Sequence, residues 1–281
     1  MAKPFVNPFV SGQFLELRVD ALVSDGRGLG RHDGVVVLVE DALPGQLVRA
    51  RVAAVRKSLA EAALVEVLER SPDEQEPPCP HAGRCGGCSW QSLAYDRQLA
   101  WKERIVHDAL ERVGKVACPP MLPILSSPSE WGYRNKMEFA FGMSGDCGKA
   151  LGLRERGSRN IVEVTGCLLQ TPLTMRVLEA VRMLSNGAFH DLDGRFLVVR
   201  EPSAGGCFVE LIVGAGGGLE AGERFAAALR TEIPEVTGFA LSERLAPSDV
   251  AYGERALYAD GRLEERIGDV RLQMGHNAFF R

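Results

Sequence analysis

The sequence lacks any uninterrupted apolar run of the roughly 18 residues that a membrane-spanning helix needs. Residues 1–8 include no apolar stretch of signal-peptide length, so we expect a cytoplasmic protein in a reducing compartment. Seven cysteines in 281 residues are too sparse for a disulfide-stapled secreted mini-protein. The 31 glycines and 15 prolines follow no triplet period, which excludes a collagen-like chain.

Net charge is small as well. The chain has 33 Lys and Arg against 37 Asp and Glu, a formal charge of −4. This excludes a wholly basic nucleic-acid binder but leaves room for a local basic face. With 46% hydrophobic residues the chain has enough apolar mass to fold, and its length predicts about two or three domains.

The first part of the chain predicts a small β-barrel. Residues 1–12 are expected to form a loose leader, and residues 13–70 contain short apolar or alternating segments separated by Gly and Pro turns. Apolar residues occupy every second position in 15–21 and again in 48–53, the pattern of half-buried strands. Several such strands in succession favour a barrel.

The rest of the chain predicts an α+β fold. Residues 71–118 contain a linker, a cysteine loop and an amphipathic helix over 92–113, and residues 119–281 form a further α+β domain. Expected helices are 173–184 and 221–229, and expected strands are 137–141, 161–164, 196–200, 208–213, 236–241, 255–258 and 270–274. The Gly-rich segment 213–219 is interpreted as a strand-to-helix turn, since it lacks the third glycine of a dinucleotide loop.

Cys79, Cys85 and Cys88 form the strongest local pattern. Three thiolates within ten residues of a Gly-rich loop can converge on one metal centre that needs a fourth ligand. Cys167 is the best-placed fourth ligand; the other candidates are His81, Cys118, Cys147 and Cys207. Zinc usually takes two Cys-x2-Cys pairs, so the three-plus-one spacing favours a [4Fe–4S] cluster. The alternatives are a zinc protein of unrelated function and three buried thiols without metal.

Several motifs occur in a characteristic order. They are Asp25-Gly26-Arg27-Gly28-Leu29-Gly30-Arg31, Leu43-Pro44-Gly45, the cysteine loop ending in Ser89-Trp90-Gln91, residues 95–102, Tyr133-Arg134-Asn135-Lys136 and Val164-Thr165-Gly166-Cys167. With these motifs the chain resembles the RNA uracil-5-methyltransferases, in particular the bacterial enzymes that make 5-methyluridine in 23S ribosomal RNA. The resemblance extends over residues 13–281.

The resemblance implies a particular architecture. It implies an N-terminal TRAM domain, which is an OB-like barrel that binds RNA, then an iron–sulfur loop and a central mixed α/β domain. It assigns the [4Fe–4S] ligands to Cys79, Cys85, Cys88 and Cys167. The cluster is then expected to clamp the cysteine loop to the distant turn at residue 167, although a redox role remains an alternative.

RNA, with 23S rRNA as the expected target, is the implied partner. Residues 131–160 hold six basic and three acidic residues, a local excess that suits phosphate binding. Candidate RNA-binding residues are Arg134, Asn135, Lys136, Arg154 and Arg156 in this region, and Arg27, Arg31, Arg56 and Lys57 in the barrel. The alternative is that these side chains only form a solvated surface.

The chain departs from the family at its last residue. Arg281 stands where the family has the Gln of a Phe-Phe-Gln motif, at the start of the domain that binds S-adenosylmethionine. We therefore expect the donor site and catalytic domain to be missing and assign no catalytic or donor-binding residue. The expected function is an RNA-binding, [4Fe–4S]-containing portion of a methyltransferase, unable to methylate alone or dependent on a separate catalytic chain. The alternative is a stand-alone RNA-binding or assembly factor.

Overall fold

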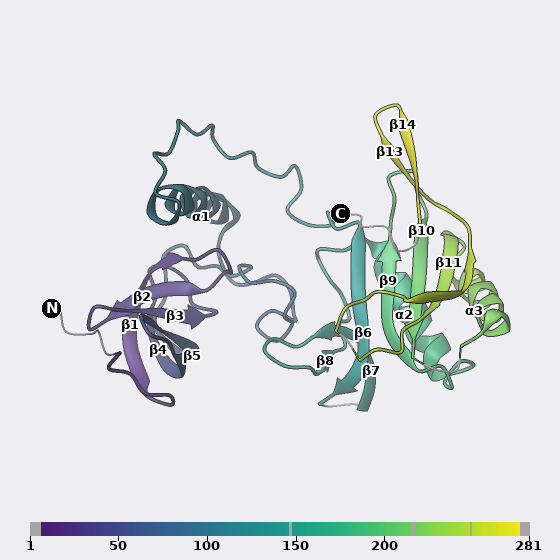
Figure 1. The fold of residues 1–281 in the computed structure, drawn as a ribbon, viewed down its shortest axis with the longest axis horizontal. Coiled ribbons are helices and arrows are strands. Elements are labelled where there is room, and N and C mark those ends of the chain that lie inside the picture. The colour runs from purple at the N-terminus through teal and green to yellow at the C-terminus, as the bar shows by residue number, and fades with distance from the viewer. Residues whose placement is uncertain (1–6, 146–147, 215–216, 248, 276–281) are drawn as a thin grey trace. The chain divides into compact units, whose positions relative to one another are not determined.

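The computed structural model describes residues 7–145, 148–214, 217–247 and 249–275, and the chain divides into two compact units (Figure 1). The first unit comprises Met1–Gly83 and Cys88–Pro128, and the second comprises Arg84–Gly87 and Ser129–Arg281. Each unit has its own hydrophobic core. Part of the cysteine loop therefore belongs to the second unit although the residues on both sides of it belong to the first.

The small β-barrel predicted from the sequence forms the body of the first unit. It is closed and five-stranded, in the order β1-β2-β3-β5-β4. Its strands are β1 (Phe14–Leu22), β2 (Gly28–His32), β3 (Val35–Glu40), β4 (Leu47–Val55) and β5 (Leu59–Glu69). Burial alternates along β1, and its inward residues Leu15, Leu17 and Val19 pack in the barrel core. All pairings are antiparallel except that of β3 with β5, which is parallel.

Residues 7–12 pack on the barrel, whereas the sequence suggested a loose leader over residues 1–12. The side chain of Phe9 is 5% exposed and packs in the barrel core. The Asn7 amide nitrogen donates to the carbonyl oxygens of Arg56 and Leu59 at 2.9 and 3.0 Å. An aromatic ring and a carboxamide thus hold residues 7–12 against the turn between β4 and β5.

A single helix follows the barrel in the first unit. Helix α1 (Tyr95–Asp108) continues into one π-helical turn (Ala109–Val113), so the predicted helix exists but starts three residues later. Its half-buried Trp101 and Ile105 pack with Leu22, Leu43 and Leu93 in a small cluster. This cluster packs the helix against residues of the barrel.

The second unit is a mixed seven-stranded sheet with the order β12-β11-β10-β9-β6-β7-β8. Its strands are β6 (Lys136–Ser144), β7 (Gly148–Arg154), β8 (Ile161–Val162), β9 (Gly194–Arg200), β10 (Cys207–Val213), β11 (Val236–Glu243) and β12 (Arg255–Asp260). Only β10 and β11 run parallel, and α3 (Leu219–Glu232) connects them. A separate hairpin pairs β13 (Leu263–Ile267) with β14 (Val270–Met274).

Side chains alternate between the two faces of this sheet. Helices α2 (Pro172–Asn186) and α3 lie against the sheet (Figure 1). Phe139, Leu197 and Leu211 pack in the main core with residues of both helices. The opposite face carries a smaller cluster of Ala140, Ala150, Ile161, Phe196, Val198 and Ile212, against which Ala251 packs. In the described ranges, no helix is both long and apolar enough to span a bilayer.

Candidate nucleic-acid interface

Three of the four predicted RNA-binding cations of the barrel lie at the same end of it. Arg56 and Lys57 form the turn that precedes β5, whose first residue is Leu59. Arg31 on β2 pairs with Val36 on β3, and Val36 pairs in turn with Leu59, so Arg31 lies at the same end of the barrel. Arg27 lies in the turn before the other end of β2. The structure therefore groups Arg31, Arg56 and Lys57 and separates Arg27 from them.

Arg27 is already paired within its own turn. Its Nε and Nη2 donate to Asp25 Oδ2 at 2.9 and 2.7 Å. The hydrogen bond from Arg27 lowers the pKa of Asp25, and the same bond raises the pKa of Arg27. The carboxylate of Asp25 partly neutralises the charge of Arg27, so Arg27 is expected to attract a phosphate less strongly than an unpaired arginine.

Arg31, Arg56 and Lys57, at the opposite end, differ in whether an acidic side chain pairs with them. Arg56 Nε lies 3.3 Å from Glu61 Oε1, an exposed pair of small energetic value. The side chains of Arg31 and Lys57 are exposed and form no hydrogen bond or ion pair with any residue that the structure describes. These two side chains have their full charge available for a ligand.

The predicted Arg134-Asn135-Lys136 motif leads into β6 on a fixed backbone. The Arg134 N–H donates at 3.0 Å and the Asn135 carbonyl accepts at 2.8 Å in bonds to neighbouring segments. Lys136 Nζ pairs with Glu138 at 2.7 Å, on the sheet face opposite the helices. Within the described residues the half-buried Arg134 guanidinium has no partner, so it is the cation of this motif with uncompensated charge.

Arg154 and Arg156 take part in tertiary structure. Arg154 donates from Nη1 to the Arg159 carbonyl at 2.6 Å and from Nη2 to Asp249 Oδ1 at 3.1 Å. The backbone N–H of Arg156 donates to the Arg84 carbonyl at 2.9 Å, which pairs the cysteine loop with the end of β7. Arg154 thus ties β7 to the loop that contains Asp249, a role that the charge count did not reveal.

A buried ion pair, not identified from the sequence, lies on the sheet face opposite the helices, the face that also carries Lys136. The side chains of Arg200 and Glu210 are 4% and 1% exposed, with Arg200 Nη1 3.7 Å from Glu210 Oε2. Ser242 Oγ donates to Glu210 Oε1 at 2.7 Å. Burial lowers the pKa of the Arg200 guanidinium, and the carboxylate of Glu210 opposes that shift. One Arg and one Glu within apolar strand segments were the available signal, because unpaired charges are almost never fully buried.

The predicted cluster cysteines are divided between the two units. Cys79 and Cys88 belong to the first unit, and Cys85 and Cys167 belong to the second. Cys85 and Cys167 both pack against the main core of that unit, and the Gly87 N–H lies 3.4 Å from Cys85 Sγ. No group of three or more Cys, His, Asp or Glu side chains in the described residues is positioned to hold a metal ion. The structure does not support the expected iron–sulfur centre, and its four ligands stay a prediction.

Two of the alternative ligands are now better defined. Cys207 is fully buried in the main core, and desolvation raises the pKa of its thiol to about 12, so it remains a neutral core residue. Cys118 is half-buried. Cys147 lies outside the described residues.

The predicted turn at 213–219 lies between a strand and a helix, and its residues 215–216 lie outside the described part of the chain. Strand β10 ends at Val213 and α3 begins at Leu219, with Gly218 as the residue before the helix. A Cβ atom on Gly217 would lie 2.8 Å from Leu257 Cδ1, so this glycine allows close packing within the fold. We assign no donor contact to this turn.

Residues 8–65 match the TRAM domain family, so the barrel is a TRAM domain. Over 96% of its length the chain is 44% identical to a protein of Nitratidesulfovibrio vulgaris described as an uncharacterized RNA methyltransferase. A Synechocystis protein with the same description is 30% identical, also over 96% of this chain. The chain spans 60% of the length of each of these relatives and is similar to them over nearly its whole length.

The fold is similar to that of a solved enzyme. The tRNA (uracil-54, C5)-methyltransferase of Pyrococcus abyssi, determined in complex with S-adenosyl-L-homocysteine, superimposes with a TM-score of 0.67. The match covers 94% of this chain and 60% of that one, at 22% sequence identity. The α+β fold with its N-terminal barrel is therefore similar to the matched 60% of that chain.

These matches overturn one expectation from the sequence. The interpretation as a portion that cannot methylate alone, without a donor site and dependent on a separate catalytic chain, is wrong. Proteins described as uncharacterized RNA methyltransferases match 96% of the chain, and the fold of a structure determined with S-adenosyl-L-homocysteine matches 94% of it. The last residue of the sequence was not a valid basis for inferring a missing catalytic domain.

Proposed function

We propose that this protein is an S-adenosylmethionine-dependent RNA methyltransferase that modifies C5 of uracil. The observation that carries the proposal is the 44% identity, over 96% of the chain, to a protein described as an uncharacterized RNA methyltransferase. The TRAM barrel and the order of sequence motifs support the same assignment. S-adenosylmethionine supplies the methyl group, and we assign no residue of this chain to the donor or to the chemical step.

The residues of this chain are proposed to hold the RNA. Arg31 and Lys57 on the barrel and Arg134 before β6 carry charge that no described residue neutralises. Cations of this kind bind phosphates and set the salt dependence of RNA affinity. Arg56, Lys136 and Arg154 lie nearby in their respective units but already have carboxylate partners. We therefore rank Arg31, Lys57 and Arg134 first among the proposed RNA contacts.

The proposal has two versions, which differ in whether the target is 23S rRNA or tRNA. The sequence motifs resemble the enzymes that modify 23S rRNA, whereas the structural relative from Pyrococcus abyssi is a tRNA enzyme. Purified protein is incubated with labelled S-adenosylmethionine and with either 23S rRNA fragments or tRNA transcripts. Nucleoside analysis by mass spectrometry then detects 5-methyluridine. We expect it in 23S rRNA; its appearance only in tRNA would reassign the substrate, and its absence from both RNAs would refute the methyltransferase proposal.

The four-cysteine cluster is a separate proposal. Its support is the Cys79, Cys85 and Cys88 spacing together with the turn at Cys167. After anaerobic purification we expect about four irons and four sulfides per chain. Cys167→Ser is expected to lose them and Cys118→Ser to retain them. One zinc without sulfide, or full retention of iron in Cys167→Ser, contradicts the assignment.

A further inference from the structure

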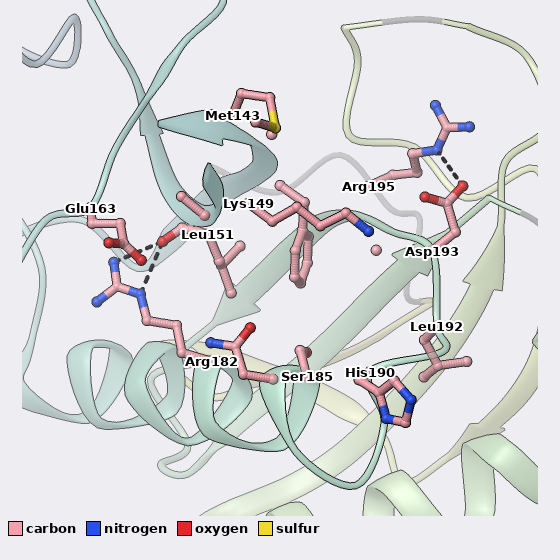
Figure 2. A pocket seen from close by; sticks show the side chains of 15 residues that line it. Met143, Lys149, Leu151, Glu163, Arg182, Ser185, His190, Leu192, Asp193 and Arg195 are labelled. Atoms are coloured by element: carbon pink, nitrogen blue, oxygen red, sulfur yellow. Dashed lines mark hydrogen bonds and ion pairs between the residues drawn. The ribbon is translucent and has the colours of Figure 1, made fainter. Parts of the chain in front are cut away.

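A cavity of about 300 Å³ lies in the second unit, on the helix side of the sheet (Figure 2). Its walls come from the hairpin of β6 and β7, the last turn of α2 and the segment 190–195. The volume is at the lower end of the roughly 300–1,000 Å³ typical of small-molecule sites. Lys136 and Arg154 alternate to the opposite face of the sheet, so the cavity is distinct from the contacts proposed there.

Lys149 supplies unpaired charge to this cavity. Its side chain extends from β7 into the cavity, toward the side on which Asp193 lies (Figure 2). It forms no hydrogen bond or ion pair with any residue in the described part of the chain. An ammonium group in this position is a compact donor that suits a phosphate.

Arg182 and the Arg195–Asp193 pair of the wall are fixed, and the exposed carboxylate of Glu163 also lines the cavity. Arg182 is 13% exposed and donates to the Leu151 carbonyl from Nε and Nη2 at 2.9 and 2.8 Å, and to the Val164 carbonyl at 3.1 Å. On the other side, Arg195 Nε lies 3.2 Å from Asp193 Oδ2. These bonds hold the wall in place before any ligand binds, which lowers the entropic cost of binding.

An aromatic ring completes one wall. A Cβ atom on Gly194 would lie 2.9 Å from three ring carbons of Phe141, so only glycine lets the chain pass this close to the ring. The ring is half-buried and lines the cavity. Ser185 and Asn186, at the end of α2, add a hydroxyl and a carboxamide to the lining, and neither side chain bonds to another described residue.

We propose that this cavity binds one nucleoside monophosphate unit. Lys149 receives the phosphate, the Phe141 ring stacks on the base, and Asp193 accepts a hydrogen bond from a ribose hydroxyl, as carboxylates do in other nucleotide sites. A ring beside an ammonium and a carboxylate, in a cavity of one-nucleotide size, matches the base, phosphate and sugar of that ligand. The unit is a residue of bound RNA or a free nucleotide. The inference is independent of the methylation step, to which none of these residues is assigned.

Calorimetric titration of the purified protein tests the proposal. The probes are uridine and adenosine 5′-monophosphate, with ribose 5-phosphate as the probe that lacks a base. We expect saturable binding of at least one nucleotide, with ribose 5-phosphate at least tenfold weaker. Lys149→Ala should weaken nucleotide binding at least tenfold, and Lys149→Arg should retain it. Arg271→Ala removes one exposed charge of the same unit outside the cavity and should change nothing.

Phe141→Leu separates stacking from charge. It should weaken nucleotide binding to the level of ribose 5-phosphate while leaving the binding of ribose 5-phosphate unchanged. No saturable nucleotide binding at millimolar concentration, or equal affinity in Lys149→Ala and in the unsubstituted protein, would overturn the proposal. Thermal unfolding of each variant verifies that it is folded.

Binding of a short single-stranded RNA distinguishes the two sources of the ligand. If a nucleotide of RNA occupies the cavity, Lys149→Ala weakens RNA binding and uridine 5′-monophosphate competes with the RNA. If the ligand is a free nucleotide, Lys149→Ala loses mononucleotide binding but keeps RNA affinity. Formation of 5-methyluridine is measured separately, so failure of the cavity proposal and failure of the proposed function are distinguishable.

Discussion

Arg200 and Glu210 form an ion pair on adjacent strands of the sheet with almost no access to water. Their side chains are 4% and 1% exposed, and Arg200 Nη1 lies 3.7 Å from Glu210 Oε2. Such a pair gains little over an apolar pair of similar size, because desolvation offsets the attraction. Removal of one partner is costly, because the other charge stays buried without compensation.

Glu210→Gln is therefore expected to lower the free energy of unfolding by about 3–5 kcal/mol. The double variant Arg200→Met with Glu210→Leu should recover most of that loss, because it buries no charge. Urea unfolding of both variants measures the two differences. A loss of less than about 1 kcal/mol in Glu210→Gln would show that the charge of Arg200 is compensated elsewhere.

The ion pair of Asp260 is expected to make the stability of the protein fall at acid pH. Arg230 donates to its two carboxylate oxygens at 2.8 and 2.5 Å, and this hydrogen bonding lowers the pKa of Asp260 below 3.8. The stabilisation is complete above the unfolded pKa and is lost as pH falls through the lower folded pKa. Asp260→Asn should be less stable than the unsubstituted protein at neutral pH and lose less stability on acidification. The exposed Asp269→Asn serves as control, and identical acid curves for Asp260→Asn and the unsubstituted protein contradict the prediction.

The local sequence pattern was sufficient to predict an element where short-range features alone determine that element. Alternation in residues 15–21 predicted β1. The helix expected over 173–184 is present as α2, which begins at Pro172 after Thr171, whose side-chain oxygen accepts the Thr174 N–H. Strand β7 was missed, because Gly148-Lys149-Ala150-Leu151-Gly152 resembles a loop. Its strand form depends on pairing with β6 and β8, which sequence order alone does not reveal.

In the candidate site, too, local sequence predicted some features, and others depend on tertiary contacts. The charge count treated Arg27 and Arg31 as equal candidates. The fold shows that Arg27 is paired with Asp25, whereas Arg31 has no such partner among the described residues. Arg200 and Glu210 lie on two different strands, so the charge in each apolar segment could indicate a buried group but not its partner. Residue type thus predicted the kind of chemistry, while tertiary contacts determined which charges are available.

Gly152 is expected to be required for the pairing of β7 with β8. A Cβ atom there would lie 2.1 Å from the Val162 carbonyl oxygen, which is backbone and cannot move aside alone. Gly152→Ala should lower the free energy of unfolding by roughly 1–3 kcal/mol. Gly166→Ala is the matched control, because a Cβ there meets no atom within 4 Å. Equal thermal stability of the two variants would contradict the prediction.

Cys207 should be chemically inert in the folded protein. Burial is the main cause that raises the pKa of its thiol to about 12, so almost no thiolate forms near neutral pH. Treatment with iodoacetamide at about pH 8 should leave Cys207 unmodified in the native protein and modify it in denaturant. Peptide mass spectrometry identifies the site. Rapid modification of Cys207 without denaturant would show that this part of the core opens.

Free and paired cations of the barrel should differ in their contribution to RNA binding. Arg31 and Lys57 have no partner in the described residues, whereas Arg49 lies 2.7 Å from Glu16 and 3.1 Å from Glu66. If the free cations contact phosphates, Arg31→Ala and Lys57→Ala each weaken binding of single-stranded RNA and reduce the slope of log affinity against log salt by about 0.7. Arg49→Ala changes the net charge equally but should leave that slope unchanged, because its charge is neutralised by Glu16 and Glu66. Fluorescence anisotropy at several salt concentrations measures all three slopes. Equal slopes for the three variants would mean that net charge, and not the end of the barrel that carries Arg31 and Lys57, governs RNA affinity.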